Sequence, residues 1–348
     1  MGAGLLANGT LARAQDRDTD GRLDAGDVAI LQFLAAAELI EADLWTQYAE
    51  LGGIGNNPPI EVDPNPNPPL NSYQAALSNL DSDGPQYITS NTLDEVSHAT
   101  FLNGYLESKG ADPVNFDEFR TLQGSTATGA QNIGRLTNLM HLNVDTSWFV
   151  RYRSATNPDF GATFPQAINI TNRTAIPITD ADLNGSSAHI QVIANVAAFH
   201  FGYIEQGGSS LYAAMNQKAK HREVVEITLG IGGDEVAHFL EWVDFAGNSV
   251  QAPVAPVTDQ GLTFPDFFAN PPLQPASLVQ PSLIFPVPCE FINPKLPKCS
   301  VIRPLTDALG GAVATIASFT ADGLFVGQSK KFLKTVNDLA AAADAATR

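Results

Sequence analysis

The stretch "DEVSHATFL", Asp94 to Leu102, decides the fold, because its first half recurs in "DEVAHFLEW", Asp234 to Trp242. Both copies carry Asp-Glu-Val-x-His, and they lie 140 positions apart. In a helix, residues three positions apart are separated by about 60° around the axis, so the two side chains of each Glu-x-x-His pair can bind the same ligand. The doubled motif therefore predicts two equivalent helices and a two-fold internal repeat.

A second pair of matches extends the repeat. An Ile-Glu pair stands before a tyrosine twice, with Glu41 seven positions before Tyr48 and Glu205 seven positions before Tyr212. Seven residues make nearly two helical turns, so each tyrosine shares a face with its glutamate. The chain therefore reads Glu, Glu-x-x-His, Glu, Glu-x-x-His in order, and both tyrosines are expected to pack or to hydrogen-bond a glutamate rather than to be redox-active.

These acidic side chains lie on otherwise apolar helical segments, which indicates a metal site. Four carboxylates gathered among apolar residues would repel one another and lose their hydration. Two divalent cations balance the four negative charges, and a mixture of carboxylate and imidazole suits iron or manganese. Glu38, one turn before Glu41, could replace or supplement it. The six candidate ligands are Glu41, Glu95, His98, Glu205, Glu235 and His238.

With this motif order the chain resembles the ferritin-like superfamily, and within it the ferritin-like domain proteins that include plant desiccation-related and fungal starvation-induced stress proteins. The Glu-x6-Tyr spacing is also similar to that of rubrerythrin. The resemblance covers roughly residues 28–110 and 188–247, and it implies a four-helix bundle that holds two metal ions. It further implies two terminal ligands, Glu41 and Glu205, two bridging ligands, Glu95 and Glu235, and one imidazole per metal, from His98 and His238.

The fold expected from this pattern is all-α. Apolar periodicity predicts helices over 28–52, 92–110, 129–153, 188–215, 221–247 and 306–345, with Thr92 as a possible N-cap. Glycines at five positions in the third and fourth long helices lower helix propensity by about 1 kcal/mol each, but the periodicity continues across them. The expected organisation is a ferritin-like bundle over 28–248 with irregular insertions at 53–91 and 111–187, a Pro-rich wrapping arm over 249–305, and a helical segment over 306–348.

A calcium loop is a further candidate, in "DRDTDGRLDAGD" at 16–27. Its acidic spacing, with glycine at the sixth loop position, resembles an EF-hand or dockerin loop, and the alternative is an acidic linker that caps the first helix. The candidate calcium ligands are Asp16, Asp18, Asp20, Arg22 through its carbonyl, Asp24 and Asp27.

The chain's start and its charge bear on location and partners. Residues 1–15 read as the remnant of a secretory signal, so export is expected, and Cys289 and Cys299 could then form a disulfide. The balance of 19 Lys and Arg against 37 Asp and Glu gives a net charge of −18, which argues against nucleic acid and anionic membranes as partners. No apolar run reaches the roughly 18 residues that span a bilayer.

The function expected from these features is that of an oxidoreductase acting on O2 or peroxide in stress protection, with two iron or manganese ions, or one of each. Disproportionation of peroxide by manganese uses the same ligand set. The alternative is a non-catalytic protein in which the metals act as a structural staple or as a store, and a homo-oligomer is compatible with either function. His141 and His200 on apolar segments are expected to be core histidines, as are Trp45, Trp148 and Trp242 core tryptophans.

Overall fold

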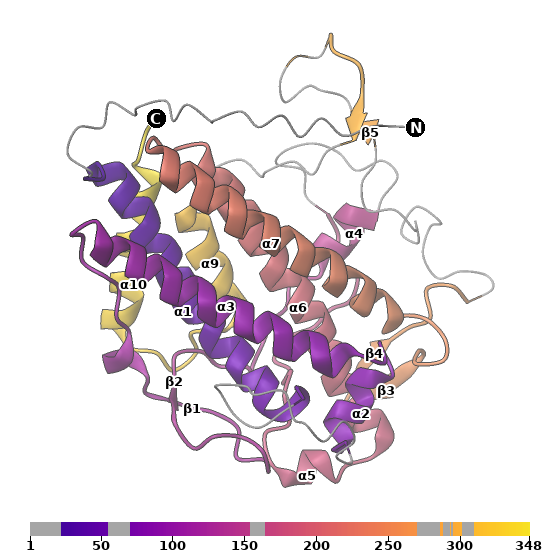
Figure 1. Cartoon of the computed structure of the whole chain (residues 1–348). Helices are drawn as coiled ribbons and strands as arrows, with labels where there is room; N and C mark the ends of the chain where they lie inside the picture. The colour runs from indigo at the N-terminus through magenta and orange to yellow at the C-terminus, as the bar shows by residue number, and fades with distance from the viewer. Residues whose placement is uncertain are drawn as a thin grey trace, which may run out of the picture.

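Four long helices make up the centre of the molecule (Figure 1). In this computed structural model they pack mainly as two pairs, in which each helix contacts the long helix nearest to it in sequence. The helices are α1 (Ala25–Gly52), α3 (Gly84–Ser108), α6 (Ser187–Asn216) and α7 (Arg222–Asn248). The structure describes residues 22–54, 70–153, 164–269, 286–287, 293, 295–300 and 310–348.

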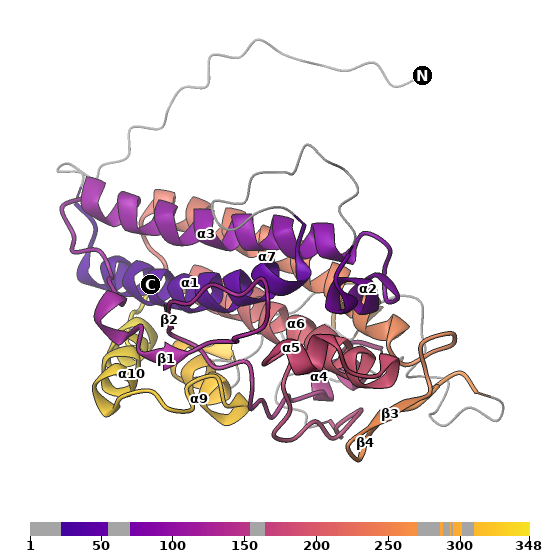
Figure 2. The ribbon, with the colours of Figure 1, turned by 90° about the horizontal axis from the view of Figure 1, so that it is seen from below.

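The helices stack in three layers, which Figure 2 shows from the side. Helices α3 and α7 form one outer layer, α1 and α6 lie beneath them, and α9 (Ala312–Asp322) and α10 (Lys330–Asp344) cover the opposite side. Because α1 and α6 are covered on both sides, most of their residues are buried. Their sequences accordingly are apolar around most of the helix, so an acidic residue there is buried as well.

The remaining elements are short and connect or flank these layers. The short helices are α2 (Ser72–Ser78), η1 (Asp117–Phe119), α4 (Ser147–Arg153) and α5 (Asp180–Leu183). The strands form three antiparallel pairs: β1 (Leu122–Gln123) with β2 (Gly134–Arg135), β3 (Val257–Asp259) with β4 (Leu262–Phe264), and β5 (Pro286–Val287) with β6 (Cys299–Ser300). The protein is therefore mostly helical, compatible with an all-α class. Among the described residues no helix has the length and apolarity to cross a bilayer.

The predicted start of the second long helix is wrong. Helix α3 begins at Gly84, and Thr92 lies buried inside it rather than capping it. The Thr92 hydroxyl donates to the carbonyl of Ile88, 2.7 Å away in the preceding turn. A threonine can satisfy its hydroxyl in this way within a helix, so its presence does not mark a helix end.

The helix predicted over 129–153 is also wrong, because only α4 at its end is helical. The backbone before α4 finds partners outside its own segment. The Asp43 carboxylate accepts the backbone N–H groups of Leu136 at 3.0 Å and Thr137 at 2.9 Å. These tertiary hydrogen bonds replace those a helix would make, so apolar spacing alone misassigned the segment.

Candidate metal centre

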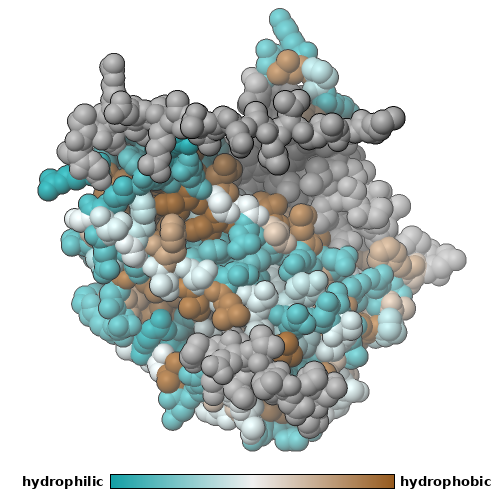
Figure 3. Space-filling view, in the orientation of Figure 1, coloured by the Kyte–Doolittle hydropathy of each residue, from teal (hydrophilic) through white to brown (hydrophobic). Residues whose placement is uncertain are grey.

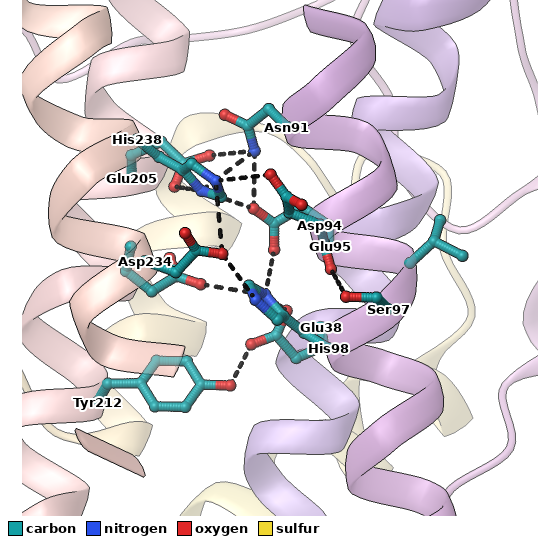
Figure 4. A network of polar contacts seen from close by, with 12 residues as sticks. Glu38, Asn91, Asp94, Glu95, Ser97, His98, Glu205, Tyr212, Asp234 and His238 are labelled. Carbon is teal, nitrogen blue, oxygen red and sulfur yellow. Dashed lines mark hydrogen bonds and ion pairs between the residues drawn. The ribbon is translucent and has the colours of Figure 1, made fainter. Parts of the chain in front are cut away.

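The four long helices bring a cluster of acidic and histidine side chains together (Figure 4). Each member is buried, with at most 7% of its surface exposed. The outer helices α3 and α7 each contribute a Glu and a His one turn apart, as the doubled motif predicts. The members are Glu38 and Glu41 from α1, Glu95 and His98 from α3, Glu205 from α6, and Glu235 and His238 from α7.

Six of these side chains form two overlapping groups with metal-ligand geometry. In each group the four potential ligand atoms lie within 4.8 Å of one another. One group is Glu38, Glu95, His98 and Glu235; the other is Glu95, Glu205, Glu235 and His238. Glu95 and Glu235 belong to both groups, so these buried Glu and His side chains are compatible with a metal site.

The structure puts Glu38 where the repeat favoured Glu41. The Glu38 carboxylate belongs to the group around His98 and accepts a hydrogen bond from the Tyr212 hydroxyl. Glu41 is a buried member of the cluster but belongs to neither group. Because the two residues are three positions apart, both face the centre, and helical spacing alone leaves the choice between them open.

Several carboxylate oxygens in the cluster accept no hydrogen bond from the described residues, although some of them lie within 4 Å of a histidine nitrogen. One oxygen each of Glu38, Glu41 and Glu205, and both oxygens of Glu235, accept no hydrogen bond from the part of the chain that the structure describes. A buried carboxylate oxygen without a partner costs a free energy of several kcal/mol. Cations bound in the two groups would satisfy the oxygens of Glu38, Glu205 and Glu235, so the residues present fit a metal group.

The two imidazoles are oriented as ligands. Nδ1 of His98 lies 3.3 Å from the nearer Glu95 oxygen and 3.5 Å from Glu38. Nδ1 of His238 lies 3.1 Å from Glu95 and 3.3 Å from Glu205. Both rings therefore turn the same nitrogen toward the shared carboxylates, where a neutral imidazole would offer its lone pair to a cation.

Without cations the cluster must hold protons instead. Burial and the charge of Glu205 raise the pKa of Glu95 to about 8, and burial with neighbouring carboxylates raises the pKa values of Glu41 and Glu235. Burial lowers the pKa of His98, but the carboxylates of Glu38 and Glu95 outweigh it and raise that pKa to about 10. Crowded negative charge thus favours any positive group at this point, proton or metal.

The aspartate of each repeated motif contacts the outer ring nitrogen of the histidine in the other motif. Nε2 of His98 lies 3.1 Å from Asp234 on α7, and Nε2 of His238 lies 3.4 Å from Asp94 on α3. A carboxylate behind a ligand histidine fixes its tautomer and its ring orientation. These aspartates were not predicted as site residues, although their repetition in both motifs was a sequence signal for a role at the site.

Asn91 on α3 links the cluster to the aromatic core. Its amide nitrogen donates to Glu95 at 2.7 Å and to Glu205 at 3.2 Å. Its amide oxygen accepts a hydrogen bond of 2.6 Å from the indole nitrogen of Trp242. No local pattern indicates this residue, because all but one of its partners come from other helices.

Two of the helix glycines make room for the cluster. A Cβ on Gly208 would stand 2.0 Å from a carboxylate oxygen of Glu235, and one on Gly232 would stand 2.8 Å from Cβ of Tyr212. Real Cβ atoms do not approach other atoms so closely. Alanine at Gly232 would therefore force α6 and α7 apart, whereas alanine at Gly208 would displace the Glu235 carboxylate from the cluster.

The other predicted site residues lie elsewhere or outside the described residues. The hydroxyl of Tyr48 contacts His200 rather than a glutamate. Asp24 caps α1 by accepting the N–H of Asp27, whose own carboxylate accepts the N–H groups of Lys220 and His221. The calcium loop stays a prediction, since Asp16, Asp18 and Asp20 lie outside the described residues, as do the signal remnant and Cys289.

Comparisons of the chain with protein-family models, with curated proteins and with solved structures found no match. What the cluster does is therefore inferred from its own geometry and chemistry. The feature that decides it is the pair of carboxylates, Glu95 and Glu235, shared by two ligand groups.

Proposed function

We propose that this protein is a ferritin-like four-helix bundle with a dinuclear iron or manganese site, and that it is an oxidoreductase acting on O2 or peroxide. The observation that carries the proposal is that two ligand groups, each containing one histidine, share Glu95 and Glu235. One Glu from each of two helices and Glu-x-x-His from each of the other two is the ligand inventory of dimetal carboxylate bundles.

The side chains would divide the work by position. Glu95 and Glu235 would bridge the two ions, Glu38 and Glu205 would each bind one ion, and each histidine would bind through Nδ1. When bound, such a metal pair supplies two-electron redox chemistry toward O2 or peroxide. The protein holds the ligands, keeps the surroundings dry and, through Tyr212, donates a hydrogen bond to Glu38.

The cluster lies closer to the surface on its histidine side than on its carboxylate side. Asp94 and Asp234, which contact the outer histidine nitrogens, have side chains 42% and 44% exposed, whereas the histidine side chains are 6% and 9% exposed. The histidines therefore lie just beneath the face of α3 and α7, from which a substrate of a reactive centre would have to enter. Figure 3 shows this face as a mixture of hydrophilic and hydrophobic residues, in which Val96 and Phe101 are exposed apolar side chains.

Export and a role in stress protection belong to the same proposal. They rest on the apolar start of the chain and on the resemblance to stress-related ferritin-like proteins. A calcium ion at 16–27 would be independent of the dinuclear site, because Asp27, the last of its candidate ligands, lies in the first turn of α1, about three turns before Glu38. Chelating calcium is then expected to leave the metals of the cluster in place.

The test is consumption of O2 and of hydrogen peroxide by protein loaded with iron or with manganese. The variant Glu235→Ala removes a shared ligand and should abolish turnover with either metal. Glu226→Ala removes an exposed glutamate of the same helix and should leave turnover unchanged. A fully metal-loaded protein that consumes neither oxidant would contradict the proposed activity. The metals would then act as a structural staple or as a store.

A further inference from the structure

A second polar network lies buried outside the metal centre. The Tyr48 hydroxyl on α1 lies 2.7 Å from Nδ1 of His200 on α6. Nε2 of the same histidine lies 3.0 Å from Asp322 on α9. All three residues are at most 1% exposed, so the Tyr48–His200–Asp322 network connects all three helices without contact with solvent.

For a neutral His200 ring, the Asp322 carboxylate sets the direction of the hydrogen bonds. The Asp322 carboxylate accepts, so Nε2 of His200 carries the proton, and Nδ1 is left to accept from the Tyr48 hydroxyl. Burial raises the pKa of Tyr48 well above its usual range, so the phenol keeps its proton. That proton faces a basic nitrogen, and the carboxylate behind the ring would stabilise the imidazolium formed by accepting it.

Aromatic rings connect this network to the metal centre. The ring centres of Tyr48 and Trp45 are 5.7 Å apart, and those of Trp45 and Trp242 are 5.3 Å apart with the planes stacked at 25°. Trp242 in turn donates to Asn91, whose amide donates to Glu95. The rings are fully buried, so an unbroken path of aromatic contacts and hydrogen bonds leads from the tyrosine to the shared carboxylates.

We propose that Tyr48 is a redox-active tyrosine that gives one electron to the metal centre and its proton to His200. This inference rests on the proposed function for its oxidant, a metal centre oxidised by O2 or peroxide. The Tyr48 O–H bond breaks, and its proton forms the N–H bond at Nδ1 of His200. The electron passes through Trp45 and Trp242 to the metal centre, which is reduced by one electron, and a neutral tyrosyl radical remains.

Tyr73 provides the contrast within the same molecule. It is also fully buried, and its hydroxyl donates at 2.7 Å, but to the backbone carbonyl of Ala175. A carbonyl oxygen accepts a hydrogen bond and cannot take the proton away at neutral pH. A one-electron oxidation of Tyr73 would therefore have no local proton acceptor, whereas that of Tyr48 would. From sequence, Tyr48 is expected to pack or to hydrogen-bond a glutamate; its histidine partner lies 152 positions away and leaves no local pattern.

The first experiment needs no metal. The metal-free protein is photolysed with ultraviolet light in the cold, and tyrosyl radicals are followed by electron paramagnetic resonance during warming. A persistent radical is expected in the wild type and in Tyr73→Phe, and its loss is expected in Tyr48→Phe. His200→Gln should shorten the lifetime by about 100-fold, the lower end of what a positioned proton acceptor contributes. The helical circular dichroism signal checks that each variant is folded. If His200→Gln does not fold, Asp322→Asn replaces it as the test of the proton acceptor.

The second experiment uses the metal-loaded protein, mixed with hydrogen peroxide and frozen at successive times. The same radical is expected to form as the metals are oxidised, to be absent in Tyr48→Phe, and to form more slowly in Trp45→Phe. Metal content is measured on each variant, since neither Tyr48 nor Trp45 is a proposed ligand and both variants should stay loaded.

The outcomes separate this inference from the proposed function. No persistent Tyr48 radical in the metal-free protein overturns the inference, whatever the metals do. A radical there, but none while loaded metals are oxidised, overturns the electron path. A protein that binds no metal overturns the proposed function and the path with it, and the first experiment still decides whether Tyr48 and His200 form a redox pair.

Discussion

Glu38 and Glu41 are the pair of residues on which the ligand assignment depends. The structure places Glu38 in the group with His98, hydrogen-bonded by Tyr212, and leaves Glu41 outside both groups. We expect Glu38→Ala to hold about one metal ion per chain and Glu41→Ala to hold about two, the full count of such a site. Metal content per chain measures both. Loss of a metal ion from Glu41→Ala alone would restore Glu41 as the ligand.

Asp94 and Asp234 offer a second test at the same scale. Each contacts the outer nitrogen of a histidine whose other nitrogen faces the cluster. Replacing both by Asn should weaken metal affinity by about 10- to 100-fold, the usual effect of losing a carboxylate behind a ligand histidine. Competition with a chelator measures the affinity. Asp338→Asn, an exposed aspartate of α10, is the control, and an unchanged affinity in the double variant would deny these aspartates a role.

The sequence predicted most of the site at this scale. Five of the six predicted ligands belong to the two groups, because a Glu-x-x-His spacing on a helix fixes which side chains share a face. Asp94, Asp234 and Asn91 were missed, since their contacts depend on how helices pack against one another. Those pairings lie more than a hundred positions apart and leave no local pattern.

At the scale of the elements, Gly207 and Gly208 form a matched pair in the middle of α6. A Cβ at Gly207 would meet no atom of the described residues within 4 Å, whereas one at Gly208 would clash with Glu235. We expect Gly207→Ala to raise the free energy of unfolding by about 0.5–1 kcal/mol, because alanine favours a helix over glycine. Gly208→Ala should lower it and weaken metal binding. Urea unfolding and metal analysis compare the two variants. Equal stability and equal metal content would contradict the predicted clash at Gly208.

Element boundaries show where periodicity suffices and where it fails. The third and fourth long helices, predicted over 188–215 and 221–247, are confirmed as Ser187–Asn216 and Arg222–Asn248 despite their glycines. The segment 129–153 also shows apolar spacing, but the Asp43 carboxylate accepts its backbone N–H groups in tertiary hydrogen bonds. A buried carboxylate from another helix cannot be seen in the segment itself, so the error was unavoidable from local sequence.

For the molecule as a whole, the buried cluster makes stability depend on pH. The pKa of Glu95 rises from 4.5 to about 8, so the folded metal-free protein keeps a proton that the unfolded chain loses over this range. His98, raised from 6.5 to about 10, likewise binds its proton more tightly when folded. Both raise proton binding in the folded state, so the free energy of unfolding should fall as pH rises across these windows.

Urea unfolding of metal-free and metal-loaded protein at about pH 6 and about pH 9 measures this dependence. The metal-free protein should be less stable at the higher pH. The loaded protein should be more stable than the metal-free protein at both, since the cations bind the folded state and compensate the carboxylates. A metal-free protein that gains stability toward the higher pH would contradict the account of the cluster.

The most direct test of the dinuclear site is elemental analysis by mass spectrometry, on protein purified without chelator and then incubated with iron and with manganese. The geometry of two ligand groups sharing Glu95 and Glu235 predicts about two metal ions per chain. Glu235→Ala should hold fewer. Neither iron nor manganese bound after incubation with both would contradict the central claim, and the repeated Asp-Glu-Val-x-His would then be a structural remnant.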